Sequence, residues 1–400
     1  MAYIIVVNPA ILKFAGFPVG ASTVATILVA SAGSLLMGLY ANRPIAVAPY
    51  MGENAFIAFG LASLGVTWQQ RLGAVFISGA LFLVITFAGL RGWLANAISP
   101  SLKYSFAVGI GLFLAFIGLN ETGIVTRAEA VPVKIGNLRS AESLLAIGGF
   151  VLIMALIQRR VRGAILIGII VTATAGILLG IGHAPQGIVA MPYSIAPIAL
   201  HLDIAGVLRL SFLPILLTLF LMSFLDTLGT LVGVTAAGGM TEDLQRPMTV
   251  DALACMISGL LGTSTSGAYI ESAAGIRDGA RTGLAAVTTA APFALSLFFI
   301  PLVTPLQELR FAYGPALIAV GVLMLDSIRR IDFDDLTELV PAFVTIIMMI
   351  FTYNIANGLT AGLVLYPIAK LLAGRPREIN GGSIVLALLC LVYYIFGLPH

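Results

Sequence analysis

The chain has 400 residues, of which 59% are hydrophobic and only 10% are charged. A soluble domain carries about 25% charged residues, so this chain lacks the polar surface that a soluble protein needs. We therefore predict a membrane protein with several spans. The formal net charge is only +3 and the basic residues are scattered, which excludes a nucleic-acid-binding surface.

Apolar runs between charges and Gly or Pro breaks predict fourteen spans. Those of the first half are 1–16, 19–40, 45–64, 70–90, 102–120, 142–158 and 163–182. Those of the second half are 208–235, 249–264, 267–280, 283–303, 313–326, 338–353 and 357–373. The remaining apolar run, 382–398, is either an interfacial helix or a fifteenth span. The first run is short for a span, so we expect either that the true start of the protein lies upstream or that this helix is tilted or incomplete.

Two halves of seven spans each would insert with opposite polarity, which is the inverted repeat of many secondary transporters. We place the first repeat at 1–182, a proline-containing linker at 183–207, the second repeat at 208–373 and a C-terminal apolar segment at 374–400. Two motif pairs favour this division. Arg71-Leu72-Gly73 and Arg281-Thr282-Gly283 open the fourth and eleventh spans, and Tyr50-Met51-Gly52-Glu53 is similar to Tyr269-Ile270-Glu271. The larger share of Lys and Arg then falls in loops on the side of the N-terminus, which places that end in the cytoplasm.

The third and tenth spans are broken. Pro44, Pro49 and Gly52 favour an extended strand followed by a half-helix from Glu53, and 263–270 is rich in Ser, Thr and Gly before a half-helix from Glu271. Broken segments at matching places in two halves indicate a transporter binding site. Each half-helix would aim unpaired N–H groups and a partial positive charge into that site.

Three acids are predicted to lie at depth in the membrane: Glu53, Asp226 and Glu271. A carboxyl at membrane depth costs roughly 2.5–3.5 kcal/mol, so such acids usually bind a substrate, an ion or a proton. Asp226, Thr230 and Gly233 share one helix face, which could also be a packing stripe. Glu53 and Glu271 could alternatively cap their half-helices.

A planar heterocycle with donor and acceptor edges would fit between the half-helices. Asn54 could donate and accept hydrogen bonds, and Phe56 or Tyr269 could stack on the ring, although such aromatic residues more often belong to the core.

Other polar residues have simpler interpretations. We expect Asp332, Asp334, Asp335 and Glu338 to form a solvated loop with Arg329 and Arg330. Arg277 and Arg281 are expected to mark the cytoplasmic end of the tenth span, with pairing to Asp278 as a lesser alternative. The cysteines, Cys255 and Cys390, lie in apolar runs and should be buried and inert. The histidines, His183, His201 and His400, fall in a loop or at the end of the sequence. We expect no enzyme, no metal site and no cofactor.

The chain resembles the nucleobase–cation symporters, in particular their adenine/guanine/hypoxanthine permease branch. The stretches that carry the resemblance are 1–12, 41–46, 224–233, 270–276 and 281–283. The resemblance implies the uracil-permease fold, an all-α polytopic membrane protein of fourteen spans in a 7+7 inverted repeat. It also implies short β-strands plus half-helices in spans 3 and 10, a core of spans 1–4 and 8–11, and a gate of spans 5–7 and 12–14.

The resemblance further implies roles for individual residues. Asp226 and Glu271 would contact the base, Asn54 would be the polar residue of the third span, and backbone groups near Tyr269 and Ile270 would take part. Glu53 departs from the family, which usually has an apolar residue there. The full predicted binding set is Asp226, Glu271, Asn54, Tyr269, Ile270, Phe56 and Thr230.

We therefore expect purine nucleobase import (adenine, guanine or hypoxanthine) by proton symport with alternating access. Asp226, Glu271 and Glu53 would couple the proton, in a multi-pass protein of the plasma membrane that could form a homodimer. The alternatives are an anion permease of the sulfate type on the same fold, xanthine- or uracil-type specificity, and a non-transporting receptor.

Overall fold

The computed structural model describes residues 1–129, 131–237 and 244–396, and its regular structure is mostly helical. The helices of the first half are α1 (Ile4–Leu12), α2 (Val19–Leu39), α3 (Met51–Ala55), α4 (Trp68–Phe87), α5 (Arg91–Ala97), α6 (Pro100–Glu121), α7 (Ala141–Gln158) and α8 (Ala164–Leu178). The linker holds α9 (Ile204–Val207). The helices of the second half are α10 (Leu213–Ala237), α11 (Gln245–Leu261), α12 (Ser272–Arg277), α13 (Leu284–Ser296), α14 (Ile300–Glu308), α15 (Arg310–Met324), α16 (Leu336–Phe351), α17 (Ile355–Leu372) and α18 (Gly381–Phe396).

Two pairs of short antiparallel strands complete the described structure. β1 (Val47–Pro49) pairs with β4 (Ser266–Ala268), and β2 (Val125–Thr126) pairs with β3 (Lys134–Ile135). Short 3-10 turns cover Lys13–Ala15, Ala62–Leu64, Leu210–Phe212, Leu297–Phe299, Leu325–Arg330 and Pro376–Glu378, and a π-helical segment covers Phe56–Gly60.

The helices follow the predicted spans closely. Within the described residues, eight helical segments are long and apolar enough to cross a membrane, and four apolar helices are shorter. The third and tenth spans are strand plus half-helix, as the Pro and Gly residues predict. The predicted eleventh span consists of α13 and α14, joined by a 3-10 turn near Pro292 and Pro305. The leftover apolar run forms α18.

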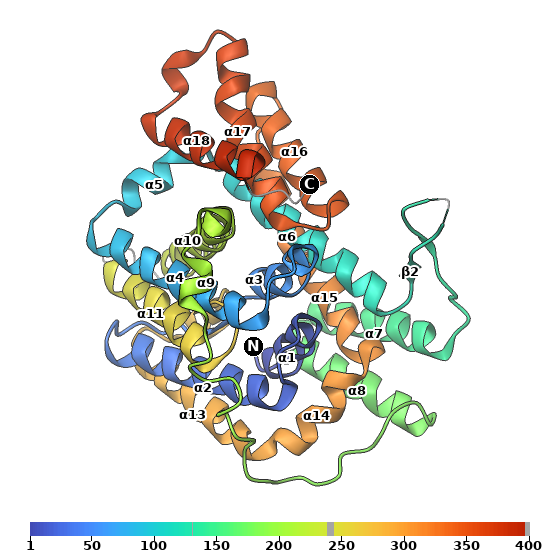
Figure 1. Ribbon diagram of the computed structural model, residues 1–400. Coiled ribbons are helices and arrows are strands. Elements are labelled where there is room, and N and C mark those ends of the chain that lie inside the picture. Colours follow the sequence, from blue (N-terminus) through green and yellow to red (C-terminus); the bar gives the residue numbers. More distant parts are fainter. Residues whose placement is uncertain (130, 238–243, 397–400) are drawn as a thin grey trace.

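The broken spans lie near the centre of the molecule. Figure 1 shows α3 and α1 in the middle, with longer helices around them. The main contacts on one side join α2 with α13 and α4 with α11, and those on the other side join α6 with α15, α16 with α17, and α7 with α8. The division into a core and a gate that move against each other stays a prediction.

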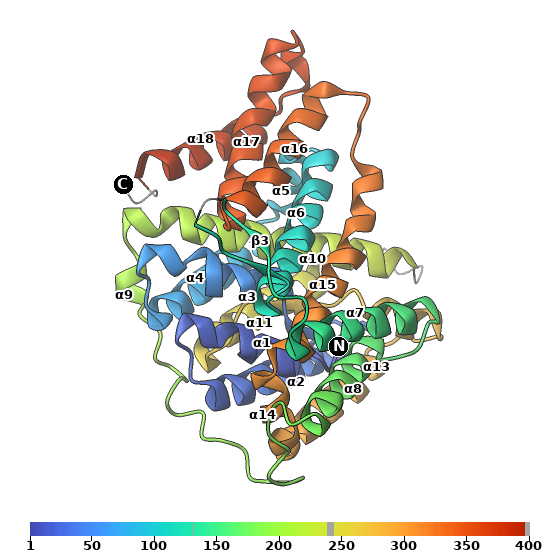
Figure 2. The same cartoon turned by 90° about the vertical axis from the view of Figure 1, so that its right-hand side faces the viewer.

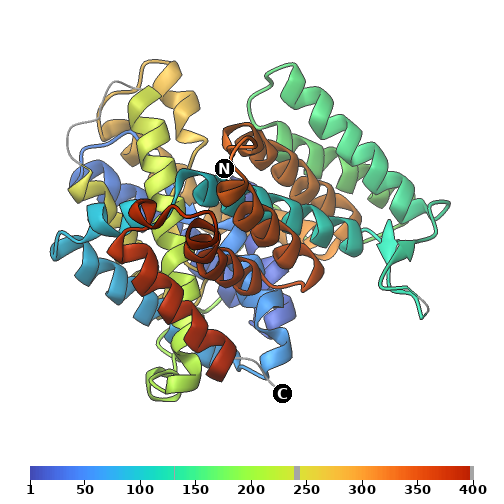
Figure 3. The ribbon, with the colours of Figure 1, turned by 90° about the horizontal axis from the view of Figure 1, so that it is seen from above.

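Segments outside the bundle are easily traced. The linker runs as extended chain along the outside of the molecule before α9 (Figures 1 and 2). From above, α7 and α8 lie side by side, and the β2–β3 hairpin projects beyond them (Figure 3). The hairpin follows Gly123, whose φ of 71° lets the chain turn after α6.

Helices from the two halves approach each other through glycines. Along α6 and α15, Gly111 lies against Gly321, and Gly118 lies against Gly314. A Cβ added at Gly118 would come 2.7 Å from the carbonyl oxygen of Gly314, closer than real Cβ atoms come. Small residues at such contacts let helix backbones pack closely in a membrane.

We predict that Gly118→Ala lowers the thermal unfolding midpoint of the detergent-solubilised protein, because the new methyl group forces α6 and α15 apart. The matched control is Gly148→Ala in α7, where the added Cβ meets nothing within 4 Å. Alanine favours a helix over glycine by about 1 kcal/mol, so the control should hold or raise the midpoint. Equal midpoints in the two variants would contradict the close contact.

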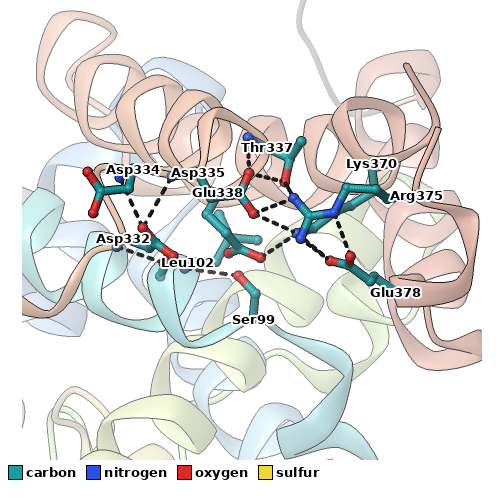
Figure 4. A network of polar contacts seen from close by, with 11 residues as sticks. Ser99, Leu102, Asp332, Asp334, Asp335, Thr337, Glu338, Lys370, Arg375 and Glu378 are labelled. Carbon is teal, nitrogen blue, oxygen red and sulfur yellow. Dashed lines mark hydrogen bonds and ion pairs between the residues drawn. The ribbon is translucent and has the colours of Figure 1, made fainter. Parts of the chain in front are cut away.

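The loop before α16 differs from its prediction. Asp335 and Glu338 are not part of a solvated loop with Arg329 and Arg330, because they belong to a charged network with Lys370, Arg375 and Glu378 (Figure 4). The Lys370 side chain is only 2% exposed, and its Nζ lies 3.0 Å from carboxylate oxygens of both Glu338 and Glu378. The cation at the end of α17 thus gathers acids from two other segments, and sequence position alone does not reveal that contact.

The acids of this network are held in their charged form. The Thr337 hydroxyl, together with the Thr337 backbone N–H and the Arg375 guanidinium, holds the pKa of the Asp335 carboxyl well below its usual range. Arg375, followed by Lys370, lowers the pKa of Glu378. A carboxyl whose pKa is depressed by folding stabilises the fold above its unfolded pKa, and that stability is lost as the pH falls through the folded value.

We predict that the wild-type unfolding midpoint falls as the pH is lowered from about 5 to about 3, since Asp335 and Glu378 then become protonated in the unfolded chain. Asp335→Asn should lower the midpoint at neutral pH and flatten this acid limb. A melting series in detergent at several pH values measures both effects, with Glu142→Gln at an exposed acid as the control. An acid limb of unchanged slope in Asp335→Asn would refute the assignment.

Candidate functional site

The two broken spans meet through their strands. β1 and β4 pair with Val47 opposite Ala268, Ala48 opposite Gly267 and Pro49 opposite Ser266. The pairing continues past the strands, because the Tyr50 N–H donates to the Thr265 carbonyl and the Tyr269 N–H donates to the Ala46 carbonyl. The strands of the two repeats therefore satisfy each other's backbone groups inside the predicted membrane region, where water cannot do so.

A half-helix follows each strand. α3 starts at Met51 and continues into the π-helical segment at Phe56–Gly60, while α12 starts at Ser272. The rings of Tyr50 and Tyr269, the residues that follow the two strands, stack with centroids 6.4 Å apart and an angle of 6° between planes. The similarity between the Tyr50 and Tyr269 motifs thus corresponds to matching positions in the two repeats.

Both helices that neighbour the strands hold them by polar contacts. On α2, Ser34 Oγ accepts from the Val47 N–H at 2.9 Å. On α11, the Asp251 carboxylate accepts from the Ala268 N–H at 3.0 Å, and the Ser258 hydroxyl donates to Ser266 Oγ at 2.8 Å. The Cys255 thiol donates to the Ser266 carbonyl, so this buried cysteine supports β4.

Asp251 is the acid that the sequence interpretation missed. It is fully buried, and its Oδ1 meets no hydrogen-bond donor in the described part of the chain. Its carboxyl lies close to the Tyr50 and Thr227 hydroxyls. The available signal was a polar stripe at i, i+4 and i+7 in the ninth span, formed by Asp251, Cys255 and Ser258.

Asn8 of α1 connects the two broken spans. Its Nδ2 donates to the hydroxyls of Thr26 and Thr263 at 2.8 Å each. Its Oδ1 accepts from Asn54 Nδ2 at 3.0 Å and from the Ser264 hydroxyl at 2.9 Å. This side chain thus holds the first half-helix against the residues that lead into β4.

Two of the predicted acids face each other across the halves. Glu53 on α3 is fully buried, and its carboxyl has the Asp226 carboxyl on α10 as a neighbour. Neither oxygen of Glu53 meets an N–H or O–H donor in the described residues. Two carboxyl groups can form a hydrogen bond only when one of them carries a proton. The arrangement therefore suits a pair that holds one proton between them.

Glu271 lies at the N-terminus of α12, half-buried, without capping that helix through its side chain. Its Oε1 accepts from the Tyr3 hydroxyl of α1 at 3.0 Å. The N–H groups of Ser272 and Ala273 donate to the carbonyls of Tyr269 and Ile270, so this half-helix begins as a tight turn. Tyr269 lies within electrostatic range of Glu271, Glu53 and Asp226, so all three predicted acids belong to this region of the protein.

The remaining predicted residues lie in varied surroundings. Asn54 is buried with its Oδ1 unpaired among the described residues, and Thr230 is half-buried one turn beyond Asp226 on α10. Phe56 is fully buried in the hydrophobic core, which agrees with the alternative that such an aromatic residue belongs to the core. The Ile270 side chain is 65% exposed, so only its backbone remains available for the predicted role.

The charged residues beyond α12 do not form the alternative that was predicted for them, an ion pair between Asp278 and Arg281. Asp278 forms an ion pair with Arg162 at 2.6 Å, whereas the Arg281 guanidinium donates to the carbonyls of Ile276 and Ala280. A hollow of about 340 Å³ lies elsewhere, lined by Lys13, Val19, Gly20, Tyr193, Thr304, Gln307 and Glu308. It contains none of the predicted site residues.

Two broken spans that cross inside a helical membrane bundle, with acids gathered around the crossing, define a membrane transporter. A model described as "Permease family" matches residues 1–360, and the chain belongs to this permease family. It is therefore a transporter and not an enzyme.

Relatives match over nearly the whole chain. The adenine permease AdeP of Escherichia coli is 38% identical over 403 residues, which cover 99% of this chain and 90% of AdeP. The guanine/hypoxanthine permease PbuG of Bacillus subtilis is 38% identical over 413 residues, which cover 99% of this chain and 93% of PbuG. The family resemblance inferred from the sequence is thereby confirmed.

A solved structure confirms the fold. The transmembrane domain of a cyanobacterium bicarbonate transporter, BicA, is similar with a TM-score of 0.66 at 16% identity, covering 90% of this chain and 94% of that chain. The predicted architecture of two inverted seven-span repeats, with strands and half-helices in spans 3 and 10, is therefore correct.

We predict that Asn8→Ala lowers the unfolding midpoint by several degrees, because it leaves buried groups on both broken spans without partners, at about 1–3 kcal/mol for each unpaired group. The control is Asn120→Ala on α6, where the amide donates only to the Phe116 carbonyl of its own helix. Thermal melting in detergent compares the two. If Asn120→Ala destabilised the protein as much as Asn8→Ala, the central role of Asn8 would be disproved.

Proposed function

We propose that this permease imports a purine nucleobase together with a proton. The observation that carries the proposal is the fully buried Glu53 carboxyl, which has Asp226 as a neighbour, at the start of a half-helix beside two stacked tyrosines. The named relatives support the substrate class, because AdeP and PbuG are permeases for adenine and for guanine/hypoxanthine.

The chemistry of the site suits such a base. A purine carries N–H groups that could donate hydrogen bonds to the carboxyls of Asp226 and Glu271. Its ring nitrogens or carbonyls could accept hydrogen bonds from Asn54 Nδ2 or from backbone N–H groups at the start of α3. The faces of Tyr50 and Tyr269 offer an aromatic surface for its ring. A bound base would separate or bridge groups that contact each other directly in this structure.

Proton coupling follows from the carboxyl pair. A proton shared by Asp226 and Glu53 would relieve the repulsion between two neighbouring carboxylates. We infer that the proton stays with the pair while the base is bound and leaves when the site opens to the cytoplasm. The proton is then the coupling ion, and the transport cycle needs no other cofactor.

Alternating access would follow from movement between the two helix groups. The core, spans 1–4 and 8–11, would carry the base past the gate, spans 5–7 and 12–14. We place the protein in the plasma membrane with its N-terminus in the cytoplasm. A homodimer would allow one copy to anchor the gate of the other.

The acids also weigh against the alternative substrate. An anion permease on this fold would use the half-helix dipoles but would need a site without negative charge. Glu53, Asp226 and Glu271 around Tyr269 supply three acids where an anion would have to bind. Labelled sulfate and labelled hypoxanthine offered to the same proteoliposomes separate the two functions.

We predict that Asp226→Asn and Glu271→Gln each reduce uptake of labelled adenine, guanine or hypoxanthine by roughly tenfold or more, because each removes a charged hydrogen-bond partner. Proteoliposomes with an imposed pH gradient provide the measurement. Glu53→Gln should retain exchange of internal for external base but lose accumulation driven by the gradient.

Glu142→Gln, at an exposed acid in the first turn of α7, is the matched control and should transport normally. Normal gradient-driven accumulation in Glu53→Gln would remove the carboxyl pair from proton coupling. Wild-type protein that takes up none of these purines would overturn the proposed function itself.

A further inference from the structure

Two arginines bind the far ends of the half-helices, and the proposed function gives them no role. Arg71 on α4 is only 5% exposed. Its guanidinium donates to the carbonyls of Ile57, Ala58 and Leu61, at the end of the half-helix that follows β1, and to the carbonyl of Val66. A buried cation thus takes four backbone carbonyls as its partners.

Arg281 makes the corresponding contact in the second repeat. Its Nη1 donates to the carbonyl of Ile276 at 2.6 Å and to that of Ala280 at 2.8 Å, at the end of α12. Arg71 and Arg281 begin the paired motifs that suggested the inverted repeat. The repeat therefore preserves a contact as well as a sequence pattern.

The glycines of the two motifs also have similar surroundings. A Cβ at Gly73 would clash with the backbone carbonyl of Asp203, and a Cβ at Gly283 would clash with that of Gly38. In both motifs the arginine reaches back to a half-helix, and the glycine two residues later admits a neighbouring chain segment. Each motif joins three segments at the outer end of a broken span.

The electrostatics give this contact a consequence at the binding site. The last carbonyls of a helix have no intrahelical partner and carry its partial negative charge, while its first N–H groups carry the positive charge. The carbonyls that bond Arg71 belong to the buried residues Ile57, Ala58 and Leu61, where water cannot satisfy them. A guanidinium bonded to them fixes the far end, and so holds the N–H groups at the other end in place.

We propose that Arg71 and Arg281 are positioning residues for substrate binding: each clamps the C-terminal end of one half-helix and thereby sets the N-terminal end that meets the substrate. The inference rests on the proposed function, because it takes the crossing of the two broken spans as the site that binds the purine. Arg71 is the stronger clamp, since it is buried and bonds four carbonyls, whereas Arg281 is exposed and bonds two.

Lysine and glutamine replacements test the clamp. Lysine keeps the positive charge but is a point donor that cannot span several carbonyls as the guanidinium fork does. We expect Arg71→Gln to raise the KM for purine uptake about tenfold and Arg71→Lys to raise it by a smaller factor, with maximal rate per folded transporter nearly kept. Arg281→Gln should raise KM about threefold, in keeping with its fewer, exposed contacts.

The split between KM and maximal rate separates positioning from mere structural support. A purely structural role would lower the amount of folded protein, and with it the maximal rate, at unchanged KM. Uptake kinetics in proteoliposomes are therefore normalised to monodisperse protein measured by size exclusion. The control is Arg139→Gln, at an exposed arginine of the loop before α7, which should leave both parameters unchanged.

The outcomes are distinct from those of the proposed function. If wild-type protein takes up purines and folded Arg71→Gln has the wild-type KM, the positioning role is wrong although the function stands. If Arg71→Gln does not fold, Arg281→Gln decides, and an unchanged KM in that variant overturns the proposal. Wild-type protein without purine uptake disproves the function before the arginines are tested.

Discussion

Backbone N–H and C=O groups within a membrane must find partners inside the protein, and the two broken spans meet that requirement by pairing with each other. β1 supplies the partners of β4, and β4 supplies those of β1. Neither repeat could keep its extended segment alone. The contact therefore forces the two halves together at one place, and it lets two half-helices begin close to that place. The polar side chains that reach the two broken spans from α1, α2 and α11 follow from the same need for partners.

The same constraint gives the acids their setting. Tyr50 and Tyr269 leave the two strands at matching positions, and their stacked rings bring the half-helix of each repeat toward the other. Glu53 belongs to the first half-helix and reaches Asp226 of the second repeat, whereas Glu271 belongs to the second half-helix and reaches Tyr3 of the first repeat. Each acid on a broken span thus contacts the opposite half. On the proposed function, a change of protonation at either acid would act on the contact between the halves, which a transport cycle would have to remodel.

Much of this arrangement could be predicted from the sequence, because Pro44, Pro49 and Gly52 exclude a continuous helix and an acid such as Asp226 is too costly in a membrane without a purpose. Asp251 was missed because it lies near the start of its span, where an acid can also reach the surface. The partners of Lys370 and Arg281 could not be predicted either. These partners depend on which helix ends meet in space. Apolar periodicity predicts where the helices lie in the sequence, but it does not predict which helices become neighbours.

The similarity to BicA, at 16% identity, separates the scaffold from the chemistry. Crossed strands and half-helices need backbone pairing and small residues, which very different sequences can supply. Half-helix N-termini alone favour a negative ligand. On the proposed function, the carboxyls of Glu53, Asp226 and Glu271 would reverse that preference toward ligands that donate N–H groups and toward protons. The choice of substrate would then depend on these few acids, and the scaffold would determine how closely they approach one another.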